Sequence, residues 1–560
     1  MDKRFFLALF LSLVVIALFQ LLFPPPKAVP GSRVTTARDS IGAANSTASS
    51  TIPLSAQPAH AGSQAAMNLR RPDLSVQART ETTTVITPKA SYQFTNFGAA
   101  PISIVIRDYP NRSPSPSGGP VDLAVPGSPL LGYRLIVPTD TVDLSQVPFV
   151  LSGERRSNAE ETLTYKASVK NVGVSIAYTV SQDTAASYVI SVSGQVSGVQ
   201  GQAYLLADLP KTLRSAEADT TADHRSLAYS FKPQRDHARS VLFGSLDPGK
   251  QTLEAGPLSW VAVKNKYFVL GILSPPNGTQ FSEVTLTGGA RASKVATTAR
   301  ATVVDAVKGD GFAFEIYAGP QESQRLMRMG QDFDHVNPYG WRFLQSVVHP
   351  IASKVIQVLL WMHNRLDLSY GWVLVILGIL VRLVLWPLNQ STMRSSLKMQ
   401  ELQPKLAAAQ KKYKDPVQQR EAIMKVYQEA GVSPFAGLTG CLPALLPMPI
   451  LFALFFVFQN TIEFRGVPFL WLHDISIKDP LYILPLLMGA SMYVLSWIGM
   501  RNAPPNPQAK MMGYMFPVMM TVVLLNMASG LNLYYTAQNI ASLPQQWFLA
   551  RERAKLRPAG

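Results

Sequence analysis

The spacing of apolar residues divides the chain into two kinds of region. Between residues 76 and 335, short segments such as PISIVIRD and SEVTLTGG alternate apolar and polar positions and are rich in Val, Ile and Thr. Alternation with a period of two, closed by Gly, Pro, Asn or Asp, is typical of half-buried strands. Several such strands, with hardly any helical periodicity between them, predict a soluble all-β sandwich domain.

Long apolar runs mark the rest of the chain. A bilayer-spanning helix needs about 20 mostly apolar residues. By this measure we predict six transmembrane helices, at residues 1–23, 371–388, 442–458, 481–500, 511–527 and 531–548, the last two joined by a turn at 528–530. The predicted fold class is therefore an α-helical membrane protein with six transmembrane helices, the last five forming a core, plus the β-sandwich domain.

The first apolar run has the features of an anchor. Lys3 and Arg4 precede it, and PPP follows it where a cleaved signal would carry small residues. The run also exceeds the roughly 7 to 15 apolar residues of a cleavable signal peptide. We therefore predict an uncleaved signal anchor, followed at residues 24–75 by a flexible linker that lacks apolar periodicity.

Two segments beside the predicted spans are helical in pattern but too polar to cross a bilayer. Residues 341–365 mix apolar and basic positions and are interrupted by Pro350, which predicts an interfacial amphipathic helix. Residues 389–430 carry two apolar stripes separated by the turn signal Asp415-Pro416, which predicts a cytoplasmic helical hairpin. The alternative for this segment is a solvated loop with ordinary membrane-flanking charge.

The charge distribution sets the orientation. The chain carries 51 Lys and Arg against 35 Asp and Glu. Residues 389–434 hold eight of the basic residues and four acidic ones, and the tail at 549–560 is also basic. By the positive-inside rule, both termini and the hairpin are cytoplasmic and the β domain lies on the opposite side. No basic stripe with interleaved aromatic residues suggests a nucleic-acid substrate.

Local motifs for catalysis are absent from the sequence. HExxH, GxSxG, P-loop and CxxC patterns do not occur, the seven His are scattered, and the single Cys441 excludes an internal disulfide. The predicted spans contain no Asp, Glu or His pair for intramembrane proteolysis. We therefore predict that the protein is not an enzyme and uses no cofactor or metal, and that the β domain is a binding or spacing module.

Arg382 stands out within the apolar run VILGILVRLVLWPL at residues 375–388. An arginine at membrane depth costs roughly 2.5 to 3.5 kcal/mol on insertion scales, so it usually faces a bundle interior or a wet cavity. Snorkelling of its head group to the membrane surface is the alternative. No acidic residue in another span can pair with it. Polar candidates for its surroundings are Gln459, Asn526, Asn532, Tyr534, Tyr535, Gln538 and Asn539, each of which has helix–helix hydrogen bonding as an alternative role.

Several long motifs carry a family resemblance. VRLVLWPL, MQELQPK, GCLPALLPMPILFALF, DPLYILPLLMG and SGLNLYYTAQNI, in this order, resemble the YidC membrane protein insertases of Gram-negative bacteria. WVAVKNKYF and YAGP in the β region add to the likeness. The resemblance implies a multi-pass protein of the bacterial inner membrane with a periplasmic β domain, which resembles sugar-mutarotase folds without their activity.

The resemblance also implies an activity and a site. An insertase and chaperone of this family helps newly made inner-membrane proteins enter the bilayer, alone or with the Sec translocon, without nucleotide hydrolysis. Its hydrophilic groove would contain Arg382 and the substrate-contacting Tyr535, with Gln538, Asn532 and Asn526 as further substrate-binding candidates. Gly378 departs from the family, which often has a hydroxyl residue there. Implied partners are substrate proteins, Sec components, membrane lipids and, through the cytoplasmic loops, the ribosome.

Two other functions stay open from the sequence. A small-solute or anion transporter could use Arg382 as its anion site, and inverted repeats of similar halves would favour it. No such repeats are visible. An assembly factor that acts through its β domain is the other alternative, and deletion of that domain distinguishes it from an insertase.

Overall fold

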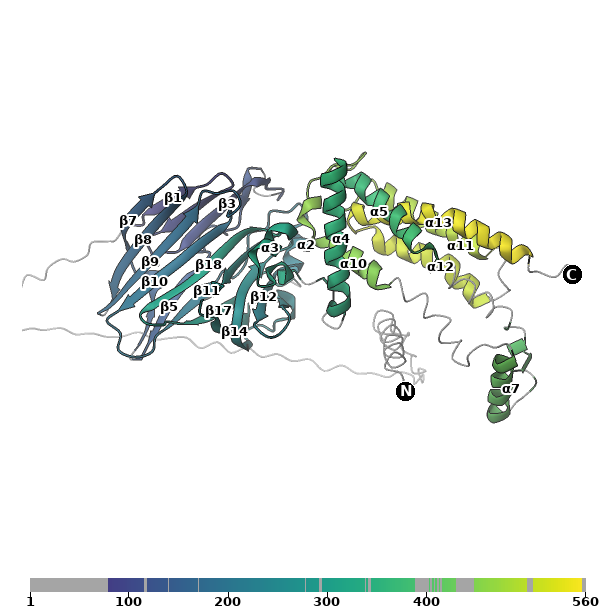
Figure 1. The fold of residues 1–560 in the computed structure, drawn as a ribbon, viewed down its shortest axis with the longest axis horizontal. Coiled ribbons are helices and arrows are strands. Elements are labelled where there is room, and N and C mark those ends of the chain that lie inside the picture. Colours follow the sequence, from purple (N-terminus) through teal and green to yellow (C-terminus); the bar gives the residue numbers. More distant parts are fainter. Residues whose placement is uncertain are drawn as a thin grey trace, which may run out of the picture. The chain divides into compact units, whose positions relative to one another are not determined.

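The computed structural model of the protein describes most of the chain (Figure 1). The described residues are 79–387, except 115–117, 139, 170, 277, 292–294, 338 and 341–343, followed by 402, 405–406, 408–409, 412, 415–429, 448–500 and 507–555. The predicted anchor at 1–23, the linker at 24–75, most of the first half of the hairpin, the start of the 442–458 span and the end of the tail lie outside the described residues.

Two antiparallel sheets make up the β domain. The smaller sheet has the strand order β1 (Thr82–Ile86), β2 (Ala90–Thr95), β3 (Pro101–Pro110), β4 (Pro120–Asp122). The larger sheet has the order β6 (Asp140–Asp143), β5 (Gly132–Val137), β11 (Tyr204–Leu209), β17 (Ala299–Ala306), β16 (Phe281–Gly288), β14 (Gln251–Lys264), β15 (Phe268–Leu273), β18 (Gly311–Pro320), β10 (Val189–Ser197), β9 (Val172–Ser181), β8 (Glu160–Val169), β7 (Val150–Arg156), and β12 (Ala228–Pro233) joins β13 (Arg239–Leu242) to β14. Short helices α2 (Thr220–Arg225) and α3 (Ser323–Met329) complete the domain.

Period-two alternation explains why the longest strands were predictable. In β9 every second residue is buried, and β8 pairs with it in a register that sets Leu163 opposite Tyr178. Phe94 of the smaller sheet packs on Tyr178 with ring centroids 4.7 Å apart, so the two sheets share one core. The predicted β-sandwich domain is confirmed as an all-β domain of two packed sheets.

The helices follow the β domain in the sequence. The described ones are α4 (Gln345–Leu366), α5 (Tyr370–Val384), α7 (Pro416–Glu429), α10 (Met448–Asn460), α11 (Ile483–Met500), α12 (Pro507–Leu524) and α13 (Ser529–Lys555). Among them, α11 is long and apolar enough to cross a membrane, and Tyr370–Val384, Pro449–Asn460 and Gly513–Leu524 are shorter apolar helices. The count of six transmembrane helices therefore stays a prediction. Of the hairpin, α7 is the described second half.

Two helices, α4 and α13, differ in detail from the pattern expected from the sequence. Of the predicted interfacial helix, α4 begins at Gln345 and continues through Pro350 near its start. The predicted turn at 528–530 is misplaced, because α13 already begins at Ser529. The backbone N–H groups of Ser529 and Gly530 donate to the carbonyls of Ile477 and Ile475, at 2.7 and 2.8 Å. These contacts satisfy N–H groups that a helix start otherwise leaves without partners.

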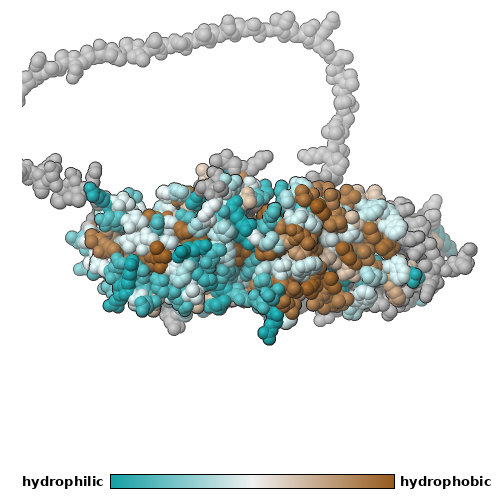
Figure 2. All heavy atoms as spheres, turned by 90° about the horizontal axis from the view of Figure 1, so that it is seen from above, coloured by the Kyte–Doolittle hydropathy of each residue, from teal (hydrophilic) through white to brown (hydrophobic). Residues whose placement is uncertain are grey.

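The helical part has an apolar core and an apolar exterior. Residues of α4, α5, α10, α11, α12 and α13 contribute to its core, including Val373, Leu454 and Tyr534. Large apolar side chains also remain exposed on α5, α11 and α12, among them Leu383, Leu486, Trp497, Val518 and Val522. Figure 2 shows hydrophobic atoms gathered over the helical part, in contrast to the mostly hydrophilic β domain. An exposed apolar surface of this kind is expected of helices that face lipid.

Candidate functional site

Arg382 lies in the last turn of α5 and points toward α13. Its Nη2 donates to Oε1 of Gln545 at 2.6 Å, and Nε2 of Gln545 donates to the carbonyl of Trp386 at 3.3 Å. Gln545 is buried, and Nε of Arg382 is buried without a hydrogen-bond partner among the described residues. In that part of the chain Arg382 also forms no ion pair. A cation held by a neutral amide keeps its full charge available for another group.

The position of Arg382 bears on the snorkelling alternative. Helix α5 ends at Val384 and residues 386 and 387 are again helical, so Arg382 lies two residues before the end of α5. A cation near the C-terminus of a helix is favoured by the helix dipole. The hydrogen bond to Gln545 nevertheless turns the guanidinium toward the neighbouring helix. The side chain is thus part of a helix–helix contact.

Close packing of α5 and α13 creates that contact. The two helices run parallel, since Leu374 lies next to Gly530, Gly378 next to Ala537, and Arg382 next to Gln545. At Gly378 the helices nearly touch. A Cβ atom there would lie 2.9 Å from the carbonyl oxygen of Tyr534 and 3.3 Å from Cβ of Ala537. Small residues allow membrane helices to approach in this way, which gives Gly378 a packing role in place of a polar one.

Replacing Gly378 with Ala is expected to lower the stability of the helical part by about 1 to 3 kcal/mol, because a backbone carbonyl cannot easily move away from the added methyl group. Thermal unfolding of the purified protein in detergent measures the effect. Gly499→Ala is the matched control, since a Cβ atom at Gly499 of α11 would meet its nearest neighbour, Oε1 of Gln546, at 3.8 Å. Equal stability of both variants would contradict the close packing at Gly378.

The other predicted site residues are spread along α13 or lie beyond it. Asn532 is fully buried, and its Nδ2 donates to the carbonyl of Leu524 at 3.1 Å. Tyr535 is half-buried beside Tyr534, and Gln538 is half-buried about one turn further toward the C-terminus of α13. At a rise of 1.5 Å per residue, Asn532 and Gln545 are about 20 Å apart along the helix. Arg382 is therefore level with Gln545, whereas Gln538 lies about 10 Å and Asn532 about 20 Å further toward the start of α13.

Asn526 is placed elsewhere. It follows α12 and lines a cavity of about 540 Å³ together with Asp219, Lys266, Gln459 and Lys478. Asn539, another polar candidate from the sequence, donates from Nδ2 to Oγ of Ser491 on α11 at 3.0 Å. For Asn532 and Asn539 the structure therefore shows the helix–helix hydrogen bonds that the sequence left as an alternative.

Gln545 is the residue of this site that the sequence reasoning missed. It lies seven residues after Gln538, which places both on one face of α13 because two helical turns span about 7.2 residues. This seven-residue spacing is the feature of the sequence that could have identified Gln545 as a site residue. Arg382 and Gln545 are 163 residues apart in sequence. Their pairing depends on the register between α5 and α13, which local periodicity does not contain.

A second polar cluster joins the loop between α10 and α11 to the β domain. Nε of Arg465 donates to Oε1 of Glu217 at 2.8 Å, and its Nη2 donates to the carbonyls of Pro110 and Ala216. Arg112 and Asp474 form another ion pair at 2.6 Å. The Arg465 side chain is 1% exposed and that of Glu217 is 9% exposed. These two ion pairs connect the loop between α10 and α11 to the β domain.

Glu463 in the same loop has no cationic partner among the described residues. Its Oε1 accepts from the Ser323 backbone N–H at 3.2 Å, and its Oε2 is buried without a partner among them. Burial raises the pKa of Glu463 from 4.5 to about 7. The folded protein therefore binds this proton more tightly than the unfolded chain, and the stability this gives is present in full below about pH 4.5 and is lost as the pH rises through 7.

Glu463→Gln is expected to make stability less dependent on pH, because the amide keeps an acceptor for Ser323 and never ionises. At pH 8 the variant should be more stable than the wild type by up to about 3 kcal/mol, and near pH 4.5 the two should be similar. Thermal unfolding between pH 4.5 and 8 measures both quantities. Parallel pH profiles of variant and wild type would show that Glu463 does not carry the effect.

Comparisons with known proteins cover both regions. A family model described as the YidC periplasmic domain matches residues 82–351, and one described as the 60Kd inner membrane protein matches residues 361–556. The membrane protein insertase YidC of Prosthecochloris aestuarii is 32% identical over 414 residues, which are 69% of this chain and 68% of that protein. Its counterpart from Chlorobium phaeovibrioides is 34% identical over 354 residues, which are 58% of this chain and 60% of that protein. The stretches matched in the first relatives thus span 59 to 68% of their length.

A solved structure described as an active YidC insertase with its first transmembrane domain resolved aligns with 84% of this chain and 93% of that one. The sequence identity is 18% and the TM-score is 0.33, so this likeness adds no support of its own. A putative mutarotase from Salmonella typhimurium aligns with 43% of this chain at a TM-score of 0.27 and 9% identity.

Proposed function

The chain belongs to the YidC family of membrane protein insertases, and on this premise we propose that it inserts newly made proteins into the bacterial inner membrane with the help of Arg382. The observation that supports this most is the contact of Arg382 with the neutral Gln545. Were the partner a carboxylate, the charge would be neutralised within the protein. Bound to an amide, it is available to a visiting acidic or polar segment.

The proposed step is electrostatic attraction followed by hydrophobic transfer. Two unit charges 4 Å apart attract by about 4 kcal/mol at an effective dielectric constant of 20. This attraction lowers the cost of drawing a polar terminus of the substrate part-way into the bilayer. Transfer of the substrate's apolar segment into lipid then supplies the driving force, at about 25 cal/mol for each Å² removed from water, so no nucleotide is required.

The remaining candidates have different parts in this proposal. Tyr535 and Gln538 precede Gln545 on α13, and they would contact a substrate that passes Arg382. Asn532 supports α13 by its bond to Leu524, and Asn526 belongs to the cavity near Lys266. We further propose that the β domain is periplasmic and meets Sec components, that both termini are cytoplasmic, and that ribosomes are contacted through the cytoplasmic loops.

Reconstitution tests the activity itself. Liposomes containing only this protein are incubated with a newly made single-span protein whose acidic tail must cross the membrane, and added protease reveals whether the tail has crossed. Protection well above that in protein-free liposomes is expected. A variant that lacks the β domain should keep most of the activity, whereas an assembly factor that acts through this domain would lose it. Protection no greater than in protein-free liposomes would refute the proposed function.

A further inference from the structure

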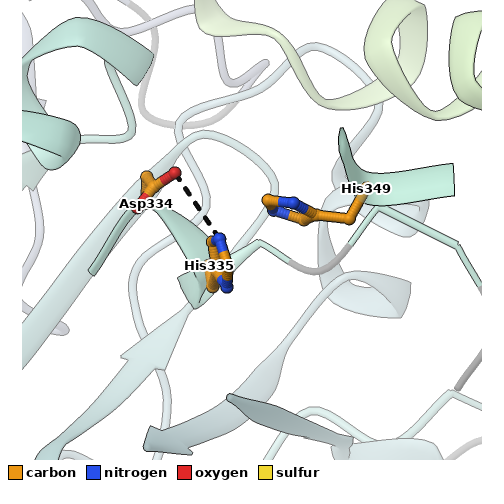
Figure 3. A group of neighbouring side chains, drawn as sticks. All are labelled: Asp334, His335 and His349. Carbon is orange, nitrogen blue, oxygen red and sulfur yellow. Dashed lines mark ion pairs between the residues drawn. The ribbon is translucent and has the colours of Figure 1, made fainter. Parts of the chain in front are cut away.

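Three potential metal ligands meet where the β domain is followed by α4. Asp334 and His335 lie in the short 3-10 helix at Phe333–Val336, and His349 lies in the second turn of α4 (Figure 3). One ligand atom from each of the three residues lies within 4.8 Å of the other two. The Asp334 carboxylate is 3.8 Å from Nε2 of His335, and the rings of His335 and His349 have centroids 3.8 Å apart.

His349 has an unused nitrogen in this cluster. The residue is 8% exposed, and its Nε2 is buried with no hydrogen-bond partner among the described residues. On the other side of the ring, Nδ1 lies 3.5 Å from Oγ of Ser353, one turn further along α4. A buried imidazole is favoured in its neutral form, which is the form that binds metals, and a polar neighbour at one nitrogen orients the other toward the ion.

The surroundings leave room for a further ligand. His335 and His349 line a cavity of about 400 Å³, whose wall also contains His237, Asp236 and Arg239. The charge of Arg239 is balanced by ion pairs with Asp236 and Glu254, so the cavity wall carries no unbalanced cation at this point. A water molecule or the His237 side chain can approach the cluster through this cavity.

From this geometry we propose that Asp334, His335 and His349 form a binding site for one divalent transition-metal ion of the zinc type. Two imidazoles and one carboxylate are a ligand set that suits Zn²⁺ and its neighbours and disfavours Mg²⁺ and Ca²⁺, which prefer oxygen ligands. Ligand atoms around tetrahedral zinc are roughly 3.3 Å apart, so the ligand atoms must approach one another by at most about 1.5 Å to close the site. The fourth position faces the cavity.

The site has a structural consequence for this region. The 3-10 helix follows the last strands of the β domain, and His349 belongs to the first helix after it. A bound ion would therefore tie the end of the β domain to the start of α4. Because the unfolded chain lacks a preformed site, binding would also stabilise the folded state.

Titration with Zn²⁺ tests the site on the full-length, detergent-purified protein without a histidine tag. Isothermal titration calorimetry is expected to give one site per chain for the wild type. His335→Gln and His349→Gln should each weaken binding at least about tenfold, since even outer-shell changes have effects of that size. His363→Gln is the matched control, because this histidine is on the same helix and instead contacts the Leu368 carbonyl at 2.7 Å.

Two further measurements keep the test independent of folding. Asp334→Asn removes a half-buried ligand with little change in shape, and its unfolding temperature without metal should equal that of the wild type while zinc binding falls. X-ray absorption at the zinc edge should show two imidazoles and an oxygen ligand. Binding that is absent in the wild type, or that is unchanged in the His335, His349 and Asp334 variants, would overturn the proposal and leave the two histidines as packing residues.

Discussion

Arg382→Ala is expected to reduce the insertion of a protein with an acidic translocated tail by at least about 30-fold. This factor corresponds to 2 kcal/mol, half of the attraction estimated for a charge pair at 4 Å. The loss is electrostatic, because Gln545 is neutral and no buried anion is left behind when the guanidinium is removed. Initial rates of tail protection in proteoliposomes measure it.

Arg382→Lys separates charge from shape in the same assay. A lysine ammonium restores the positive charge but not the planar guanidinium, and it is expected to retain much of the insertion rate. Arg382→Gln has similar reach and no charge, so it should behave like alanine. If all three variants inserted the tail at the wild-type rate, Arg382 would be a packing or snorkelling residue.

Arg465→Ala is expected to have the largest effect on stability, about 3 to 5 kcal/mol. The reason is that Glu217, only 9% exposed, would lose its ion-pair partner and stay buried. Burial already raises the pKa of Glu217 to about 7 although Arg465 acts in the opposite direction. Thermal unfolding measures the loss of stability. The measurement is made at pH 8, where the Glu217 carboxyl group of the wild type is mostly ionised.

The pair can be tested by combining variants. Glu217→Gln together with Arg465→Ala should recover part of the lost stability, because a neutral amide is cheaper to bury than a carboxylate. Lys250→Ala is a suitable surface control, since Lys250 and Asp247 form an exposed ion pair that is expected to contribute little. An Arg465→Ala effect as small as that of Lys250→Ala would contradict a buried ion pair.

Local sequence pattern predicted the parts of the fold that local forces determine. Strands such as β9 and β18 bury every second residue for most of their length, and alternation revealed them. Strand β7 lies at a sheet edge with almost all of its residues exposed, so it has no apolar face from which alternation could predict it. The start of α13 was displaced by backbone contacts with the loop at 475–477, which no helix-end signal in the sequence contains.

The same division holds for the sites. Arg382 was predictable because a charge in an apolar run is conspicuous, but its partner Gln545 depends on the register of α5 against α13. In the sequence, Gly378 was noticed only as a departure from a family pattern. Its packing against the Tyr534 carbonyl explains why this position has no side chain. The histidine cluster escaped because His335 and His349 are 14 residues apart, outside any local ligand motif.

The attraction between Arg382 and negative charge on the substrate can be measured by changing both partners. Insertion rates are measured for wild type and Arg382→Gln with two versions of one substrate, whose tail carries either Asp residues or Asn residues at the same positions. We expect insertion of the acidic tail to fall far more than insertion of the neutral tail when Arg382 is replaced, with a coupling energy of about 1 to 2 kcal/mol. Equal losses for both tails would show that Arg382 does not act on the substrate's charge.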